Sequence, residues 1–375
     1  MKNIYQCKAV RLSEQLQEDI EDGLFKADSV LRTEDLVARY QVSRPTVRRA
    51  LRILTENKRL VRQSQRGLRV PESAGQNNQF IPPAVAQKLT LGIVWAGTWA
   101  GESSYAHTQR LQGIKRYTEL HGLALRSYLA RTLDEVLEIL DRIDQYPVDG
   151  IIVTPFLEDQ HLRILRNLAN QGYPLVSTSR IGDLALSSVM SDDKVGAYQA
   201  THYLIEKYAR PVYYICHAPH EEIAADRHQG YNEAMRDAGF EEELDRCQYH
   251  LEISDANSDY WSMDRNWLAG GRAAEKLFKE VDRPISVLCM NDFVARGVYK
   301  AAHNHGLTIG KDVNVVGTDD LPLARLLKPA LTTVRPRHEE LGYEEARILH
   351  QLIEKKIQPP VHVHLPVELV VRESA

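Results

Sequence analysis

Three arginines are spaced so that they share one face of a helix. Arg44, Arg48 and Arg52 recur every four residues, and residues four apart lie on the same side of an α-helix. A guanidinium group is planar and always charged, and it binds phosphate oxygens or the O6 and N7 edge of guanine. The spacing therefore predicts contact with a nucleic acid.

The charge around these arginines supports the same chemistry. Residues 44–69 contain nine Lys or Arg and one acidic residue, Glu56. Residues 1–71 have a net charge of +6, whereas residues 72–375 have a net charge of −10. A local excess of this size is typical of a surface that binds a polyanion. The alternative is a solvated surface, but such surfaces usually mix charges of both signs.

Apolar periodicity predicts the helices that position the arginines. The first helix has its apolar residues four apart: Leu12, Leu16, Ile20 and Leu24. Thr33 would cap a second helix, and Ser43 would cap a third in which Pro45 occupies the first turn. The third helix has an apolar stripe that faces away from the arginines: Val47, Ala50, Leu51 and Leu54.

A basic hairpin is predicted after the third helix. Its strands lie around residues 60–62 and 68–70, and Gly67 in the connecting turn allows a positive φ. A hairpin in this position is a wing, and Arg66 at its tip suits a narrow minor groove.

Residues 5–71 resemble a GntR-type winged helix-turn-helix DNA-binding domain. The resemblance rests on residues 31–36 (LRTEDL), 42–51 (VSRPTVRRAL) and 66–70 (RGLRV). It implies that double-stranded operator DNA is the partner. Asp35 stands where the family usually has an arginine, so the sequence preference should differ, with Arg32 as a candidate replacement. The predicted DNA-binding residues are Arg32, Ser43, Arg44, Thr46, Arg48, Arg49, Gln65, Arg66 and Gly67.

The rest of the chain reads as a linker followed by an α/β domain. Residues 72–88 are polar, contain two adjacent prolines and show no helical period. In residues 89–375, short apolar runs alternate with helical patterns, which predicts doubly wound parallel sheets. This stretch is longer than one such sheet needs, so we expect two lobes.

Residues 89–375 resemble the effector-binding domain of the LacI/GalR family, which is itself similar to periplasmic sugar-binding proteins. The matching segments are residues 148–154 (VDGIIVT), 189–193 (VMSDD), 227–231 (RHQGY), 290–292 (MND), 315–320 (VVGTDD) and 331–334 (LTTV). The resemblance implies two lobes joined by three crossovers, near residues 191, 321 and 335. It also implies a homodimer that binds a palindromic operator and is controlled by a sugar-like effector, a pentose being the first expectation.

Parallel sheets bind ligands at the carboxyl ends of their strands. Arg180, Asn291 and Asp319 follow predicted strands, and Arg227 opens a helix beside them. Such side chains hydrogen-bond sugar hydroxyls, while aromatic rings stack on the apolar face of a sugar. The resemblance ranks Arg227, Asn291 and Asp319 highest; each could instead be a helix cap or a surface ion-pair partner. The wider predicted set is Arg180, Asp192, Asp193, Trp99, Tyr105, Trp267 and Phe293, with a core role equally open for the aromatic residues.

Other classes of protein have weaker support. We found no glycine-rich nucleotide loop, no nucleophile elbow and no metal spacing among the histidines, so we expect neither an enzyme nor a cofactor. His362 and His364 lie in an alternating segment, Val361–Val371, which reads as a solvated strand. Scattered cysteines and the lack of a long apolar run indicate a cytoplasmic protein without a membrane span. The alternatives are a sugar receptor without gene control, or a sugar-modifying enzyme fused to a DNA-binding domain.

Overall fold

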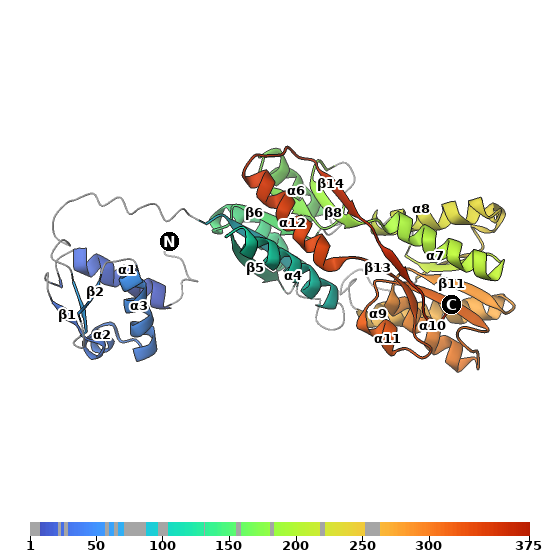
Figure 1. The fold of residues 1–375 in the computed structure, drawn as a ribbon, viewed down its shortest axis with the longest axis horizontal. Coiled ribbons are helices and arrows are strands. Elements are labelled where there is room, and N and C mark those ends of the chain that lie inside the picture. The colour runs from blue at the N-terminus through green and yellow to red at the C-terminus, as the bar shows by residue number, and fades with distance from the viewer. Residues whose placement is uncertain are drawn as a thin grey trace. The chain divides into compact units, whose positions relative to one another are not determined.

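A computed structural model describes residues 8–21, 24–25, 29–56, 60–63, 67–70, 88–96, 104–130, 132–154, 159–180, 184–217, 222–251 and 263–375. The chain divides into two units, Met1–Val85 and Ala86–Ala375 (Figure 1). Nearly all of the predicted linker, residues 72–88, lies outside the described residues. Among the described helices, none is long and apolar enough to cross a membrane.

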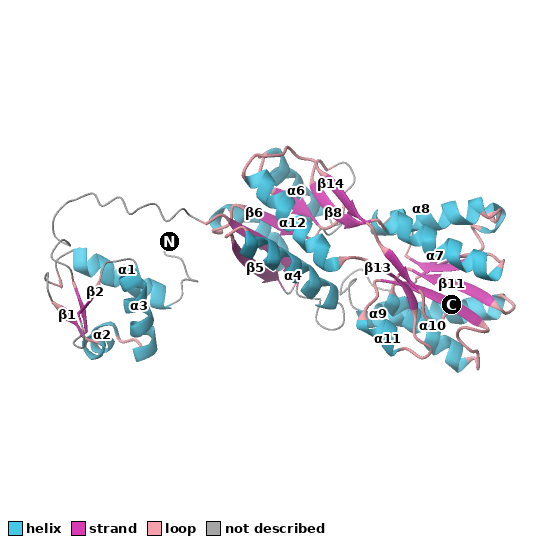
Figure 2. Cartoon of the chain, viewed as in Figure 1, coloured by secondary structure: helices cyan, strands magenta, loops and turns pink. Residues whose placement is uncertain are grey.

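Unit 1 is a winged helix-turn-helix. Its helices are α1 (Lys8–Glu21), α2 (Thr33–Tyr40) and α3 (Arg44–Glu56), and its strands are β1 (Val30–Leu31), β2 (Val61–Gln63) and β3 (Gly67–Arg69). The strands form an antiparallel sheet in the order β1-β3-β2 (Figure 2). Two details differ from the prediction. Arg32 takes the N-cap position of α2 without a side-chain hydrogen bond, and Leu24 follows the end of α1 and is 51% exposed.

Unit 2 has two lobes, as the sequence predicts. Lobe 1 contains β4 (Thr90–Ala96), α4 (Ser104–Leu120), β5 (Ala124–Ala130), α5 (Leu133–Asp141), β6 (Gly150–Val153), α6 (Asp159–Asn170), β7 (Leu175–Ser177), β8 (Ser187–Ser191), α12 (His338–Ile353) and β14 (His362–Leu365). Its sheet has the order β14-β8-β7-β6-β4-β5 and is parallel throughout. Strands β6 and β7 are buried at every position, which explains the continuous apolar sequence of β6.

Lobe 2 repeats this architecture. It contains α7 (Asp193–Tyr208), β9 (Val212–Cys216), α8 (Glu222–Asp237), β10 (Gln248–His250), α9 (Met263–Glu280), β11 (Ile285–Cys289), α10 (Asp292–Asn304), β12 (Val313–Thr318), α11 (Pro322–Leu326), β13 (Thr332–Arg335) and β15 (Glu368–Val370). The sheet order is β10-β9-β11-β12-β13-β15, and β15 is its antiparallel member. Helices α7 and α8 cover one face of the sheet, and α9 and α10 cover the other (Figure 1).

The chain crosses between the lobes at three points, two of which were predicted. One lies between β8 and α7, near residue 191, and another between β13 and α12, near residue 335. The predicted crossover near residue 321 is wrong, because Leu321 is the N-cap of α11 within lobe 2 and packs against Phe293 and Leu323. The third crossover lies between β14 and β15, so the segment Val361–Val371 supplies one strand to each lobe.

Glycines allow the closest helix contacts in unit 2. A Cβ atom on Gly342 of α12 would lie 1.9 Å from the carbonyl oxygen of Arg110 in α4, and one on Gly230 of α8 would lie 2.0 Å from that of Lys194 in α7. No side chain fits at these distances, so only glycine permits the approach. The second contact brings the middle of α8 close to the start of α7, where several predicted site residues lie.

Candidate functional site

Helix α3 has the two faces that the sequence predicted. Val47, Ala50, Leu51 and Leu54 are at most 5% exposed and belong to the core of unit 1. Of the three arginines predicted on the opposite face, Arg44 and Arg48 are exposed, and the side chain of Arg52 lies outside the described structure. The helix is therefore anchored by its apolar side while these guanidinium groups reach solvent, an arrangement that suits insertion into a major groove.

The polar residues around the start of α3 are accessible as well. The hydroxyl oxygens of Ser43 and Thr46 lie 2.8 Å apart, and Arg44 Nη2 lies 3.8 Å from Glu34 Oε1, with both side chains 67% exposed. This exposed pair is weak, so a phosphate can compete for Arg44. Arg32 and Asp35 are also exposed.

Part of the predicted DNA-binding set is outside the described structure. Gln65 and Arg66 are not described, and neither is the side chain of Arg49. Gly67 begins β3, where it pairs with Gln63 of β2. The antiparallel pairing of β2 and β3 is the hairpin expected of a wing.

In unit 2, the guanidinium of Arg227 gathers groups from three segments. Its Nε and Nη2 donate to Oδ1 of Asp193, at 3.2 and 3.1 Å. Nη2 also lies 3.5 Å from Oδ1 of Asp319, and Nη1 donates to the carbonyl oxygen of Met290. These groups come from the start of α7, the end of β12 and the end of β11, so the carboxyl ends of two strands meet here as predicted.

This cluster contains two carboxylates and one guanidinium that have little exposure to solvent. The Arg227 side chain is 11% exposed, that of Asp193 is 16% and that of Asp319 is 26%. Burial raises the pKa of Asp319 to about 6, which Arg227 opposes and Asp193 reinforces. Asp319 also has a φ of 107°, a conformation that costs an L-residue of order 1–3 kcal/mol and persists where the surroundings enforce it.

A cavity of about 340 Å³ adjoins Asp319. Its lining comes from α4 of lobe 1, from lobe 2 and from the β13–α12 crossover: Tyr105, Gln109, Asp319, Asp320, Arg325, Arg335, Pro336, Arg337, His338, Glu339 and Glu340. Two predicted residues, Tyr105 and Asp319, are among them. Burial lowers the pKa of His338 to about 3, so its ring is neutral. In the described structure, neither ring nitrogen of His338 makes a hydrogen bond of good geometry, although the backbone of Asp319 is close enough to raise the pKa of the ring slightly against the effect of burial.

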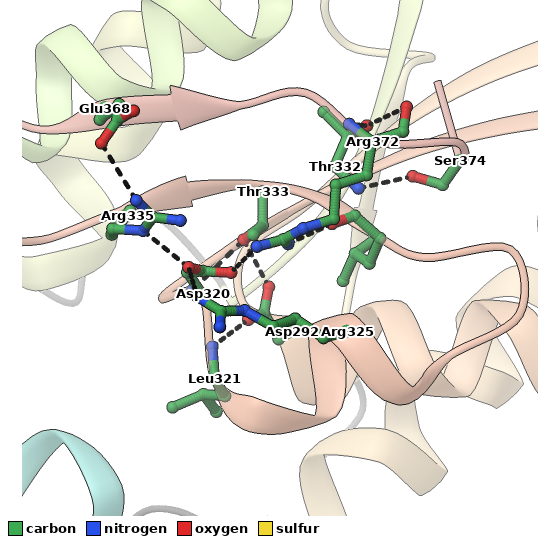
Figure 3. A network of polar contacts seen from close by, with 11 residues as sticks. Asp292, Asp320, Leu321, Arg325, Thr332, Thr333, Arg335, Glu368, Arg372 and Ser374 are labelled. Atoms are coloured by element: carbon green, nitrogen blue, oxygen red, sulfur yellow. Dashed lines mark hydrogen bonds and ion pairs between the residues drawn. The ribbon is translucent and has the colours of Figure 1, made fainter.

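Asp320, which lines the cavity, is the centre of a polar network (Figure 3). Its carboxylate accepts from Nε of Arg335 at 2.7 Å and from Nη2 of Arg372 at 2.5 Å. Arg325 lies farther away, at 3.7 Å. Arg335 also pairs with Glu368, at 3.2 Å. Because these residues flank the second and third crossovers, the network fixes the strands that lead from lobe 2 to lobe 1.

Asp292 supplies a second buried carboxylate next to this network. Asp292 accepts from the hydroxyl of Thr333 at 2.6 Å and from the backbone N–H of Leu321 at 2.8 Å. Burial raises the pKa of Asp292, and the nearby Asp319 adds to the rise. Asp292 therefore ties the start of α10 to β13 and to the turn that carries Asp319 and Asp320.

Several predicted residues have structural roles that compete with ligand contact. Asn291 caps α10 by accepting from Val294 N at 2.8 Å, and Asp192 caps α7 by accepting from Val195 N at 3.1 Å. Phe293 is 4% exposed and packs against Leu321 and Leu323, so the core role that the sequence left open is the one its contacts favour.

The remaining predicted residues are dispersed. Arg180 is exposed, and its backbone N–H lies 2.8 Å from the sulfur of Met190. Trp267 has Arg296 and Lys300 over its ring, each at 5.0 Å. Trp99 lies outside the described residues.

Sequence reasoning missed most of the cavity lining. His338, Gln109 and Arg335 follow no predicted strand, and Arg372 is 52 residues from the Asp320 that it contacts. The sequence did point to Tyr105 and Asp319, which are in the predicted set, and to Arg335, which lies at a predicted crossover.

Family models match a segment of each of the two units. Residues 8–70 match the model of bacterial regulatory proteins of the gntR family. Residues 201–375 match a periplasmic binding protein-like domain.

Individual relatives cover more of the chain. The ribose operon repressor of Halalkalibacterium halodurans is 28% identical over 246 residues, which are 64% of this chain and 67% of that protein. A Bacillus subtilis protein named as a probable HTH-type transcriptional repressor, ExuR, is 25% identical over 349 residues, 91% of this chain and 97% of its own length. Among solved structures, the transcriptional regulator CelR in complex with cellobiose has a TM-score of 0.65 and 23% identity, covering 89% of this chain and 92% of CelR.

The fold and these matches define the class of protein as a DNA-binding transcriptional regulator. More particularly, the chain joins a GntR-type winged helix to a two-lobed, periplasmic-binding-protein-like domain.

Proposed function

We propose that this chain is a repressor whose affinity for an operator is controlled by a sugar-like molecule bound between the lobes of unit 2. The observation that carries the proposal is the cluster of Arg227 with Asp193 and Asp319, beside a cavity lined from both lobes. A ligand that contacts both lobes stabilises one relative arrangement of them, and this is how binding at one site changes affinity at another.

The chemistry of the cluster favours a hydroxyl-rich ligand. Carboxylate oxygens of Asp319 and Asp193 accept from hydroxyl groups, and a guanidinium donates to hydroxyl oxygens. The buried ring nitrogens of His338, which make no hydrogen bond of good geometry, offer a further donor or acceptor, since buried polar atoms usually have a well-aligned partner. Tyr105, which is 39% exposed, provides an aromatic surface for stacking. Two similar proteins, a ribose operon repressor and a regulator in complex with cellobiose, also favour a carbohydrate.

DNA binding would use the exposed side of α3 and the wing. Arg44 and Arg48 would enter the major groove, with Ser43 and Thr46 at the backbone and Arg32, Arg49, Gln65 and Arg66 around them. We propose a homodimer on a palindromic site whose half-sites are about 10 base pairs, or a multiple of that, apart. The protein would act in the cytoplasm as a receptor and would leave its ligand chemically unchanged.

A thermal-shift screen of the full chain against a panel of monosaccharides and disaccharides tests the ligand. A ligand that binds only the folded state raises the melting temperature, and Asp319→Ala should abolish the shift. Tyr343→Phe serves as a control, because Tyr343 does not line the cavity. The proposal fails if no carbohydrate shifts the wild type, or if a sugar that shifts it is recovered chemically altered.

A further inference from the structure

A second polar cluster lies at the carboxyl ends of β9 and β10 in lobe 2. Cys216 ends β9 and His250 ends β10, and these two residues are opposite each other in the parallel pairing of the two strands. His228 lies on α8, next to Arg227 but with a different set of contacts. The three ligand atoms, one from each side chain, lie within 4.8 Å of one another.

The separations are close to those that a metal ion requires. Cys216 Sγ is 3.8 Å from His250 Nδ1, whereas sulfur and nitrogen on a tetrahedral zinc ion are about 3.5 Å apart, given bond lengths near 2.3 and 2.0 Å. Small rotations of the side chains would therefore bring all three atoms to bonding distance. One thiolate with two imidazoles is a ligand set that zinc prefers over magnesium or calcium.

His228 is held in the form that a metal ligand needs. Its Nε2 lies 2.9 Å from the carbonyl oxygen of His217. A carbonyl only accepts, so Nε2 carries the hydrogen and Nδ1 keeps its lone pair. Burial lowers the pKa of His228 and so favours the neutral ring, whereas the hydrogen bonds with His217 and Gln248 oppose this shift. A backbone carbonyl that orients the second ring nitrogen is the usual support of a metal-bound histidine.

The cluster also opens onto a cavity of its own. About 360 Å³ of space is lined by His228, Asn232, Asp245, Gln248 and His250, and none of these residues lines the cavity beside Asp319. A metal ion held by three protein ligands would have its fourth position toward this polar space, where water can bind.

We infer that Cys216, His228 and His250 form a binding site for a zinc-like transition-metal ion. On binding, the Cys216 thiol loses its proton to solvent and the resulting thiolate sulfur forms a bond to the metal, while both imidazoles bind through neutral nitrogen. Because the metal binds a thiolate and neutral imidazoles, protons compete with it, and affinity should increase with pH.

Titration of the full chain with Co²⁺ tests this site without DNA or sugar. The wild type should show a sulfur-to-cobalt charge-transfer band that saturates at one equivalent and disappears on addition of Zn²⁺. Cys216→Ser should lose the band. Since Cys216 is buried and its variant could misfold, the exposed His250 provides the second variant: His250→Gln should weaken binding by at least about tenfold.

An exposed histidine outside the cluster supplies the matched control. His303→Gln should bind Co²⁺ as the wild type does, since His303 lies near the end of α10. The inference is overturned if the wild type gives no charge-transfer band, if Cys216→Ser is folded and keeps the band, or if His250→Gln and His303→Gln bind Co²⁺ equally well.

Discussion

Nη2 of Arg227 lies 3.5 Å from Oδ1 of Asp319, and so an ion pair joins helix α8 to the residue that follows β12. Asp319 has a positive φ and borders the cavity that both lobes line. A ligand that replaces part of this contact would act on α8, β12 and the crossover to lobe 1 together. Such a connection between ligand and hinge is what allosteric control requires.

The pKa of Asp319 makes ligand binding dependent on pH. With a pKa of about 6, the carboxyl is protonated at pH 5 and ionised above pH 7. Hydroxyl donors stabilise the ionised form, so effector affinity should be about tenfold weaker at pH 5 than at its plateau above pH 7. Isothermal titration with the sugar found in the screen measures this. Asp319→Asn should bind weakly at both pH values, and a wild-type affinity that does not change with pH would contradict the assignment.

Glu345 should make the stability of unit 2 fall as pH rises. Its carboxyl is fully buried on α12, accepts from Arg110 at 2.7 Å, and has a pKa that burial raises to about 7 from 4.5. At pH values between 4.5 and about 7, the folded state therefore keeps the Glu345 carboxyl protonated, whereas in the unfolded state the carboxyl has released its proton. Stability from this group is complete below pH 4.5 and is lost as pH rises through 7, by roughly 3 kcal/mol.

Urea unfolding at pH 5 and pH 7.5 tests this prediction for Glu345. Glu345→Gln removes the titrating proton and should reduce the difference in free energy of unfolding between the two pH values. An equal pH dependence in wild type and variant would show that other groups are responsible.

The two arginines on Asp320 should differ sharply in their contribution to stability. The Arg372 side chain is 13% exposed and 2.5 Å from Asp320, whereas Arg325 is 68% exposed and 3.7 Å away. Arg372→Ala removes a partner from a buried carboxylate and should lower the free energy of unfolding by about 3 kcal/mol. Arg325→Ala, the matched control, should change it by less than about 1 kcal/mol. Urea denaturation distinguishes the two, and equal losses would refute the described network.

Arg48 should contribute to DNA binding without affecting the effector site. Arg48→Ala is expected to weaken operator binding by about 1–3 kcal/mol, as measured by fluorescence anisotropy at fixed salt. Arg163→Ala removes an exposed arginine of lobe 1 and should have no effect. Operator affinity that survives Arg48→Ala would exclude this side chain from the interface.

Periodic elements could be predicted from the sequence, and this covers most of the fold. The arginine face of α3 follows from four-residue spacing, and the buried strands of both lobes follow from apolar runs such as residues 150–153 and 285–289. The alternation of strands and helices was enough to indicate two doubly wound lobes.

Long-range contacts could not be predicted in the same way. Residues 361–371 alternate as one strand would, yet the segment is divided between two sheets, since pairing partners and not local pattern decide where a strand lies. Likewise, Arg372 reaches Asp320 and Cys216 meets His250 because non-adjacent elements pack together. For Asn291 the sequence left two roles open, and the structure shows that its side chain caps α10.

The most direct test of the account measures operator affinity of the full chain with and without a saturating sugar. A duplex selected from a random library provides the operator, and the thermal-shift screen provides the sugar. The wild type should change its dissociation constant by about 5-fold or more when the sugar is bound, while Asp319→Ala should bind the duplex equally well in both conditions. An unchanged dissociation constant in wild-type protein that demonstrably holds the sugar would contradict the account.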